Sequence, residues 1–170
     1  MVLILLLIMV IIVSGCLISI WISYNRFTVS RFTVTSDKIL SPLRIVLISD
    51  LHDHRFDSCN EKLSEMIKEQ TPDIIIIDGD MINGDSENAE TAVTLIHRLI
   101  DIAPVYYSYG NHEYYYIEAG HNKLQEELES AGAVVVNYRN VDIQVKGNPI
   151  RIGGLYEYGG DTYMQSDEEN

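Results

Sequence analysis

An uninterrupted apolar segment opens the chain. Residues 2–22 read VLILLLIMVIIVSGCLISIWI and contain no charged side chain. As a helix that rises about 1.5 Å per residue, this segment would cover about 30 Å of hydrocarbon, the thickness of one bilayer core. Trp21 and Tyr24 lie where the headgroup region would be, and Arg26 follows where the chain would return to water. The pattern predicts a single transmembrane anchor over residues 1–24.

Two other interpretations of this segment stay open. A cleaved signal peptide is disfavoured, because no Lys or Arg precedes the apolar run and the run is longer than the usual apolar region of such peptides. The sequence Val13-Ser14-Gly15-Cys16 resembles a bacterial lipobox, in which the cysteine is lipidated after cleavage, but apolar residues continue past Cys16. The anchor and the lipobox would both tether the chain to a membrane.

Beyond the anchor, short apolar runs alternate with polar turns. Alternating residues at 27–35 predict a half-exposed strand, so residues 25–43 are interpreted as a linker with a first strand. The compact apolar run at 44–49 predicts a strand that is buried on both faces. Asn60 is expected to cap a helix over 61–70.

The alternation of strands and helices continues as far as residue 136. We predict strands at 74–77, 104–109 and 133–136, helices at 89–101 and 121–131, and polar loops at 78–88 and 110–120. A β-hairpin is expected next, with strands at 141–146 and 150–156. This order is typical of an α/β fold with a sheet of parallel strands.

The net charge of the chain restricts the kinds of partner that it can bind. The 170-residue chain has a formal net charge of −13 and a pI of about 4.6, and it has room for one domain after the anchor. Nucleic-acid binding is not expected, because it depends on basic side chains that neutralise phosphates. The few basic residues near the anchor, Arg26, Arg31 and Lys38, lie on its C-terminal side, so the positive-inside rule places the domain in the cytoplasm.

Polar motifs follow three of the predicted strands. They are Asp50-Leu51-His52, Asp78-Gly79-Asp80 and Gly110-Asn111-His112-Glu113. The carboxyl ends of parallel strands meet at one edge of a sheet, where functional groups gather. On an extended segment, Asp50 and His52 would point the same way while Leu51 turns inward. The glycine in each of the other two motifs would permit a tight turn.

These motifs together predict a metal site. Each one alone could be an ordinary strand end or turn, but three at successive strand ends favour a shared function. Carboxylate, imidazole and amide groups suit divalent ions such as Mn, Fe, Zn or Mg, and the absence of cysteine from these loops argues against structural zinc. Two such ions about 3.5–4 Å apart would generate hydroxide and hold a phosphoryl group for attack.

For the residues next to the three motifs, we expect supporting roles around the metal site. Asp53 and His54 are assigned to a solvated loop, where either could touch substrate, and Glu113 is expected to lie behind the metal ligands. Tyr114, Tyr115 and Tyr116 are expected to line the rim of a substrate site.

This set of motifs resembles the calcineurin-like metallophosphoesterase family, in its membrane-anchored bacterial form. The resemblance rests on D-x-H, G-D and G-N-H-E within residues 44–113, and on the phrases RIVLISDLH and PDIIIIDGD. It implies a four-layer αββα sandwich and hydrolysis of a phosphomonoester or phosphodiester with two metal ions. By the same resemblance, Asp50 and His52 would ligate the first metal, Asp80 would bridge both and Asn111 would ligate the second. His112 would act on the substrate, as general acid or as phosphate-binding group.

The sequence also departs from the family pattern. Family members carry a further lone His and a G-H-x-H motif, whereas no histidine follows His121 here. We therefore expect residues 44–170 to be the N-terminal portion of the domain. The alternative to a hydrolase is a catalytically inactive, membrane-anchored interaction module. Anchored members resemble envelope proteins, so we expect an extracytoplasmic domain, against the charge rule.

Overall fold

The first part of the chain is a long apolar helix. The computed structural model describes residues 2–155, and the chain divides into two compact units, of which the first ends at Val34. Helix α1 (Val2–Asn25) confirms the predicted helix, and none of its residues is buried. It is long and apolar enough to cross a membrane, a property that it shares with signal sequences.

The strand predicted at 27–35 is wrong. Residues 26–36 form no strand, and the side chains of Phe32 and Val34 are 89% and 90% exposed. A strand needs a neighbour that accepts its backbone hydrogen bonds, and none of the strands in the described part of the chain pairs with this segment. Alternation of apolar and polar residues was therefore insufficient evidence for a strand.

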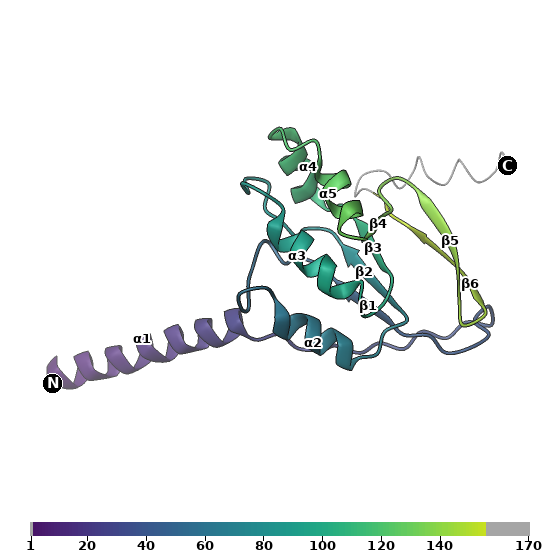
Figure 1. The fold of residues 1–170 in the computed structure, drawn as a ribbon. Helices are drawn as coiled ribbons and strands as arrows, with labels where there is room; N and C mark the ends of the chain where they lie inside the picture. The colour runs from purple at the N-terminus through teal and green to yellow at the C-terminus, as the bar shows by residue number, and fades with distance from the viewer. Residues whose placement is uncertain (1, 156–170) are drawn as a thin grey trace. The chain divides into compact units, whose positions relative to one another are not determined.

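The second unit is built around a four-stranded parallel sheet (Figure 1). Its strands are β1 (Ile45–Ile48), β2 (Ile74–Asp78), β3 (Val105–Ser108) and β4 (Val134–Val135), and they lie in the order β1-β2-β3-β4. All three pairings are parallel, with Ile48 opposite Ile77 and Asp78 opposite Ser108. The carboxyl ends of β1, β2 and β3 therefore lie at the same edge, as the motifs required.

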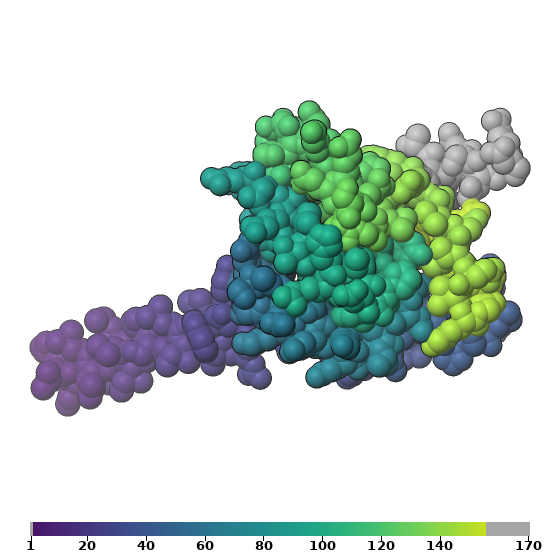
Figure 2. Space-filling model, in the orientation of Figure 1, coloured from purple at the N-terminus to yellow at the C-terminus, as the bar shows by residue number. Residues whose placement is uncertain are grey.

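Helices cover one face of the sheet and a hairpin covers the other. Helices α2 (Glu61–Glu69), α3 (Glu90–Leu99) and α5 (Leu124–Ser130) share a core with Ile75, Ile77 and Tyr107 of the strands. In the space-filling view, their blue, teal and green atoms make a continuous surface (Figure 2). The predicted hairpin is confirmed as β5 (Asn140–Val145) and β6 (Asn148–Gly153), whose apolar side chains pack against Ile74 and Tyr106 on the opposite face. Residue 156, the end of the second predicted strand, lies outside the described residues.

Strand β1 is not buried on both faces, contrary to the prediction. Val46 and Ile48 pack against the helical core, but Ile45 and Leu47 are 46% and 62% exposed. The reason is the position of β1 at the edge of the sheet, beyond the part of this face that the hairpin covers. An apolar run of four residues cannot distinguish an edge strand from a central one.

Two predictions at helix starts differ from the structure. Asn60 stands at the N-cap position of α2, as predicted, but its side chain makes no capping hydrogen bond; instead, the Asp57 carboxylate accepts backbone N–H groups of Glu61 and Lys62 at 2.8 and 2.9 Å. The hydrogen bond from Lys62 is the main cause that lowers the pKa of Asp57. The predicted loop at 110–120 contains helix α4 (Asn111–Glu118); Gly110 is its N-cap residue, and the side chain of Glu113 accepts the Gly110 N–H.

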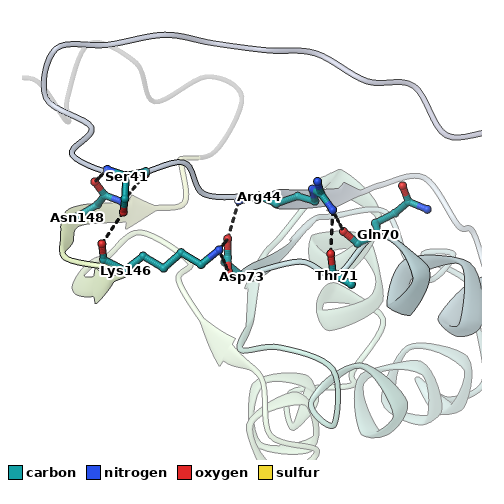
Figure 3. A network of polar contacts seen from close by, with 7 residues as sticks. All are labelled: Ser41, Arg44, Gln70, Thr71, Asp73, Lys146 and Asn148. Atoms are coloured by element: carbon teal, nitrogen blue, oxygen red, sulfur yellow. Dashed lines mark hydrogen bonds and ion pairs between the residues drawn. The ribbon is translucent and has the colours of Figure 1, made fainter.

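Polar contacts fasten the chain at the amino ends of the strands (Figure 3). Asn148 is fully buried: its side-chain oxygen accepts the backbone N–H groups of Leu40 and Ser41 at 2.6 and 3.2 Å, and its amide donates to the Ser41 carbonyl at 2.9 Å. The Asp73 carboxylate accepts the Arg44 backbone N–H and the Lys146 ammonium, both at 2.8 Å. We call Ser41, Arg44, Asp73, Lys146 and Asn148 the amino-end clasp.

Candidate metal centre

Three side chains converge at the carboxyl ends of β1 and β2. Asp50, His52 and Asp80 each offer one ligand atom, and these atoms all lie within 4.8 Å of one another. His52 Nε2 lies 3.9 Å from Asp50 Oδ1. Within residues 2–155, no Lys or Arg forms an ion pair with either carboxylate. Two carboxylates and an imidazole without a countercharge have the chemistry that a divalent cation requires.

The backbone of these loops is not the extended segment that the sequence suggested. Asp50, His52, Asp53 and Asp80 have φ values of +56°, +47°, +57° and +54°, in the left-handed region that residues other than glycine rarely adopt. Hydrogen bonds between the loops hold this conformation: the N–H groups of Asp50, His52 and Asp53 donate to the carbonyls of Gly79, Asp80 and Met81. Leu51 does turn inward and is 7% exposed. The side chains of Asp50 and His52 therefore converge because their loop is hydrogen-bonded to the loop that carries Asp80.

Two glycines allow the second and third loops to touch. A Cβ on Gly79, where φ is +71°, would lie 2.1 Å from the Gly110 nitrogen. A Cβ on Gly110 would lie 2.4 Å from Oδ1 of Asp80. Any side chain at either position would force the loops apart and displace Asp80.

Glu113 joins the same two loops from beneath. Its carboxylate is fully buried and accepts four hydrogen bonds, from the N–H groups of Asp80, Met81 and Gly110 at 2.8, 3.0 and 2.8 Å and from the Tyr107 hydroxyl at 2.7 Å. Burial, with the adjacent Glu113 charge, raises the pKa of Tyr107 well above its usual value, so Tyr107 stays a donor. The position of Glu113 behind the candidate ligands agrees with its expected role.

The third motif starts helix α4. Asn111 is the first residue of α4 and is half-buried, and the next residue, His112, donates its backbone N–H to Asp80 Oδ1 at 3.0 Å. The His112 ring lies edge-on to that of His52, with ring centres 4.5 Å apart. Its Nδ1 accepts the Gly84 N–H at 3.2 Å. His112 therefore lies beside the converging side chains.

The tyrosines of α4 divide into different roles. Tyr115 is 52% exposed, and its ring centre lies 6.0 Å from that of His112, which suits the expected rim. Tyr116 is buried and stacks on His121, so its predicted place at a rim is wrong. The Tyr114 hydroxyl donates to Asn137 Oδ1 at 2.6 Å. Helical geometry separates these three side chains because successive residues point about 100° apart.

Sequence reasoning missed the contacts of Asp53, which is not a freely solvated residue. Its carboxylate accepts hydrogen bonds from Asn83 and Ser86, both in the loop after Asp80. Only the polar character of residues 83–86 was visible in the sequence, and polar loops are usually solvated.

Comparison with known proteins agrees with this arrangement. The family model for calcineurin-like phosphoesterases matches residues 43–169. The chain belongs to this family. An uncharacterized metallophosphoesterase of Bacillus subtilis (strain 168), YkoQ, is 29% identical over 119 residues, which are 68% of this chain and 44% of that protein. The uncharacterized protein YpbG of the same organism is 27% identical over 132 residues, 77% of this chain and 48% of YpbG.

A third relative extends the comparison to another organism. The uncharacterized metallophosphoesterase Cj0846 of Campylobacter jejuni is 27% identical over 122 residues, 69% of this chain and 30% of Cj0846. The chain thus spans about half the length, or less, of the curated relatives that it matches. Membership of the family confirms the resemblance that the three motifs predicted.

Proposed function

We propose that this calcineurin-like phosphoesterase domain takes part in hydrolysis of a phosphate ester, a phosphomonoester or phosphodiester, with a metal-activated water. The convergence of Asp50, His52 and Asp80 within 4.8 Å, without a basic partner in the described part of the chain, carries this proposal. A cluster of two carboxylates repels a phosphate dianion, so the substrate can bind here only when cations are present.

The proposed ligand roles follow the position of each side chain. Asp50 and His52 would hold a first divalent ion, Asp80 would bridge two ions, and Asn111 would ligate the second. The ions would be Mn, Fe, Zn or Mg, and when bound they would supply an activated water and offset the charge of the phosphoryl group. The Glu113 contacts support this assignment, because they hold the backbone of Asp80 and Gly110 from beneath.

His112 is proposed to meet the substrate as a hydrogen-bond donor. Because Nδ1 accepts the Gly84 N–H, the neutral ring carries its proton on Nε2. Donation from Nε2 to a phosphoryl oxygen keeps the Gly84 contact. Action as a general acid would require the imidazolium form, in which Nδ1 is also protonated and can no longer accept the Gly84 N–H. The geometry therefore favours the phosphate-binding role over the general-acid role that the resemblance also allowed.

Helix α1 is proposed to tether the domain to a membrane, with the domain on the extracytoplasmic side. The length and hydropathy of α1 support a span. Alkaline phosphatase fused to the C-terminus, which is active only after export, tests the orientation. Activity in whole cells supports this side of the membrane, whereas an inactive fusion protein at normal abundance supports the cytoplasmic side that the basic residues indicate.

Metal-dependent hydrolysis tests the proposed function. The full chain in detergent should bind Mn²⁺ and hydrolyse p-nitrophenyl phosphate or its bis-ester, and inorganic phosphate should bind only when Mn²⁺ is present. Asp80→Ala should abolish metal binding and turnover. Asp78→Asn is the matched control, because Asp78 is an exposed carboxylate that lies only two residues away. Metal binding without turnover would support the inactive interaction module, and absence of both would contradict the proposal.

A further inference from the structure

The carboxylate of Asp53 gathers the loop that follows Asp80. Its Oδ2 accepts the backbone N–H of Asn83 at 2.8 Å, the side-chain amide of Asn83 at 3.3 Å and the hydroxyl of Ser86. The Asn83 amide also donates to the His52 carbonyl at 3.1 Å. Residues 83–86 are therefore fastened to the loop that carries two candidate metal ligands, although they lie about thirty positions later in the chain.

The fastened loop presents one backbone group to His112. The Gly84 N–H donates to Nδ1 of His112 at 3.2 Å. Gly84 also packs so closely against α4, the helix that carries His112, that a Cβ at this position would lie 2.6 Å from the Cβ of Tyr115. Asp53 and α4 thus both confine the segment at Gly84, and the His112 ring meets a donor whose position is set by the fold.

We propose that Asp53 is a positioning residue for His112. By holding residues 83–86, it keeps the Gly84 N–H on Nδ1, and this contact leaves Nε2–H as the group available to a phosphoryl oxygen. A hydrogen bond to one ring nitrogen determines which nitrogen carries the proton and how the ring is turned. The inference rests on the proposed function, because the benefit of this tautomer lies in binding phosphate at the metal site.

The variant that tests this role must respect the backbone at position 53. Asp53 has φ of +57°, which glycine adopts without strain. Asp53→Gly therefore removes the carboxylate and keeps the turn. Asp53→Asn keeps one side-chain oxygen that can accept the same donors and serves as the conservative rescue. Asp85→Gly is the matched control, because Asp85 is an exposed carboxylate in the same loop and takes part in none of the described hydrogen bonds.

The first measurement reads the tautomer without any turnover. Long-range ¹H–¹⁵N spectra of the full chain in detergent micelles, with Mg²⁺ as a diamagnetic metal, report the protonation of each His112 ring nitrogen. We expect an unprotonated Nδ1 and a protonated Nε2 in the wild type, the Asp53→Asn variant and the Asp85→Gly control, and averaged shifts in Asp53→Gly. A wild-type His112 protonated on Nδ1, or an unchanged spectrum in Asp53→Gly, would overturn the inference.

The second measurement uses bis-p-nitrophenyl phosphate hydrolysis. Asp53→Gly should lower kcat by about 10- to 100-fold, the usual effect of removing a supporting hydrogen-bond partner, while the Kd for Mn²⁺ changes by less than about twofold. Combined with His112→Ala, Asp53→Gly should cause no further loss, because both changes act through the same ring. Additive losses, or a parallel loss of Mn²⁺ affinity, would contradict the role. If the wild type shows no turnover, the proposed function fails, and the tautomer measurement alone decides this inference.

Discussion

The two ends of the parallel sheet carry polar clusters of opposite kinds. In the amino-end clasp, Asp73 has a Lys146 ammonium and an Arg44 N–H at 2.8 Å, and the buried Asn148 amide uses both its oxygen and its nitrogen. At the carboxyl end, the carboxylates of Asp50 and Asp80 face each other and His52 without a basic partner in the described residues. The Asp73 carboxylate of the clasp is paired with the Lys146 ammonium, whereas the carboxylates of the candidate metal centre require a bound cation to balance their charge.

The amino end of the sheet therefore contributes to stability, and the carboxyl end contributes to the proposed function. Paired groups lower the free energy of the folded chain, while unpaired like charges raise it until a ligand binds. We therefore expect substitutions in the clasp to lower stability without changing metal affinity. Substitutions of the candidate metal ligands should instead weaken metal binding without lowering stability.

Replacing Glu113 should have the largest effect, and it should act on stability although Glu113 lies at the carboxyl end. Glu113→Ala leaves two buried and two partly buried donors without an acceptor and should lower the free energy of unfolding by about 3–5 kcal/mol. Urea unfolding of the full chain in detergent measures this, with Glu118→Ala as an exposed control on the same helix. If Glu113→Ala does not fold, Glu113→Gln, which keeps one acceptor oxygen, should fold with a smaller loss. Wild-type stability in both variants would contradict the prediction.

Replacing Asp50 should weaken metal binding and leave stability almost unchanged. Asp50→Asn should weaken Mn²⁺ binding by at least about 100-fold, more than the usual effect of a residue behind the ligands. The metal-free stability should change by less than about 0.5 kcal/mol, because this side chain is 67% exposed. Electron paramagnetic resonance of free Mn²⁺ measures the affinity, and Asp78→Asn is the control. Equal affinities in Asp50→Asn and the wild type would remove Asp50 from the ligand set.

Replacing Asn148 should lower stability and leave metal affinity unchanged. Asn148→Ala should lower the free energy of unfolding by about 2 kcal/mol, because its fully buried side chain bonds partly buried N–H and C=O groups of Ser41, which would lose their partners. The Mn²⁺ affinity should stay within about twofold of wild type, since the clasp lies at the opposite end of the strands. Gln144→Ala on the same hairpin is the exposed control. A large change in Mn²⁺ affinity would show that the two ends are coupled.

Replacing Lys146 should cause the smallest change in stability, and the size of this change should depend on pH. Burial opposes ionisation of Asp73, but the hydrogen bonds from Lys146 and Arg44 outweigh it and lower the pKa of Asp73 below its ordinary value of 3.8. The stability that this pair contributes is therefore complete above pH 3.8 and is lost as the pH falls through the lower folded-state pKa.

Lys146→Met should thus cost less than about 1 kcal/mol at neutral pH, because the ammonium is partly exposed. The difference from wild type should shrink in acid. Chemical unfolding at a series of pH values measures it, with Lys123→Met as the control, since Lys123 forms none of the described ion pairs. A difference that grows on acidification would show that another group is responsible.

The accuracy of prediction from sequence varied with the source of the signal. Strands β2 and β3 were predicted within about one residue, because an apolar run between turn signals has few alternatives. The strand at 27–35 was wrong, since pairing depends on a distant partner. Helix α4 was missed because its start depends on Glu113 reaching back to Gly110, a contact that the pattern of apolar residues does not contain.

The order of strands and helices, the apolar helix α1 and the three motifs of the family can all be read from the amino-acid sequence. Local chemistry carries these signals, because apolar runs, glycines and clustered ligand types can be read from neighbouring residues. Three features became visible only in the folded chain: Asp50 and His52 meet through left-handed loop residues, β1 is exposed on one face, and Asp53 holds the loop at Gly84 against His112. These features depend on contacts between residues about thirty or more positions apart, which chain folding creates and sequence patterns do not record.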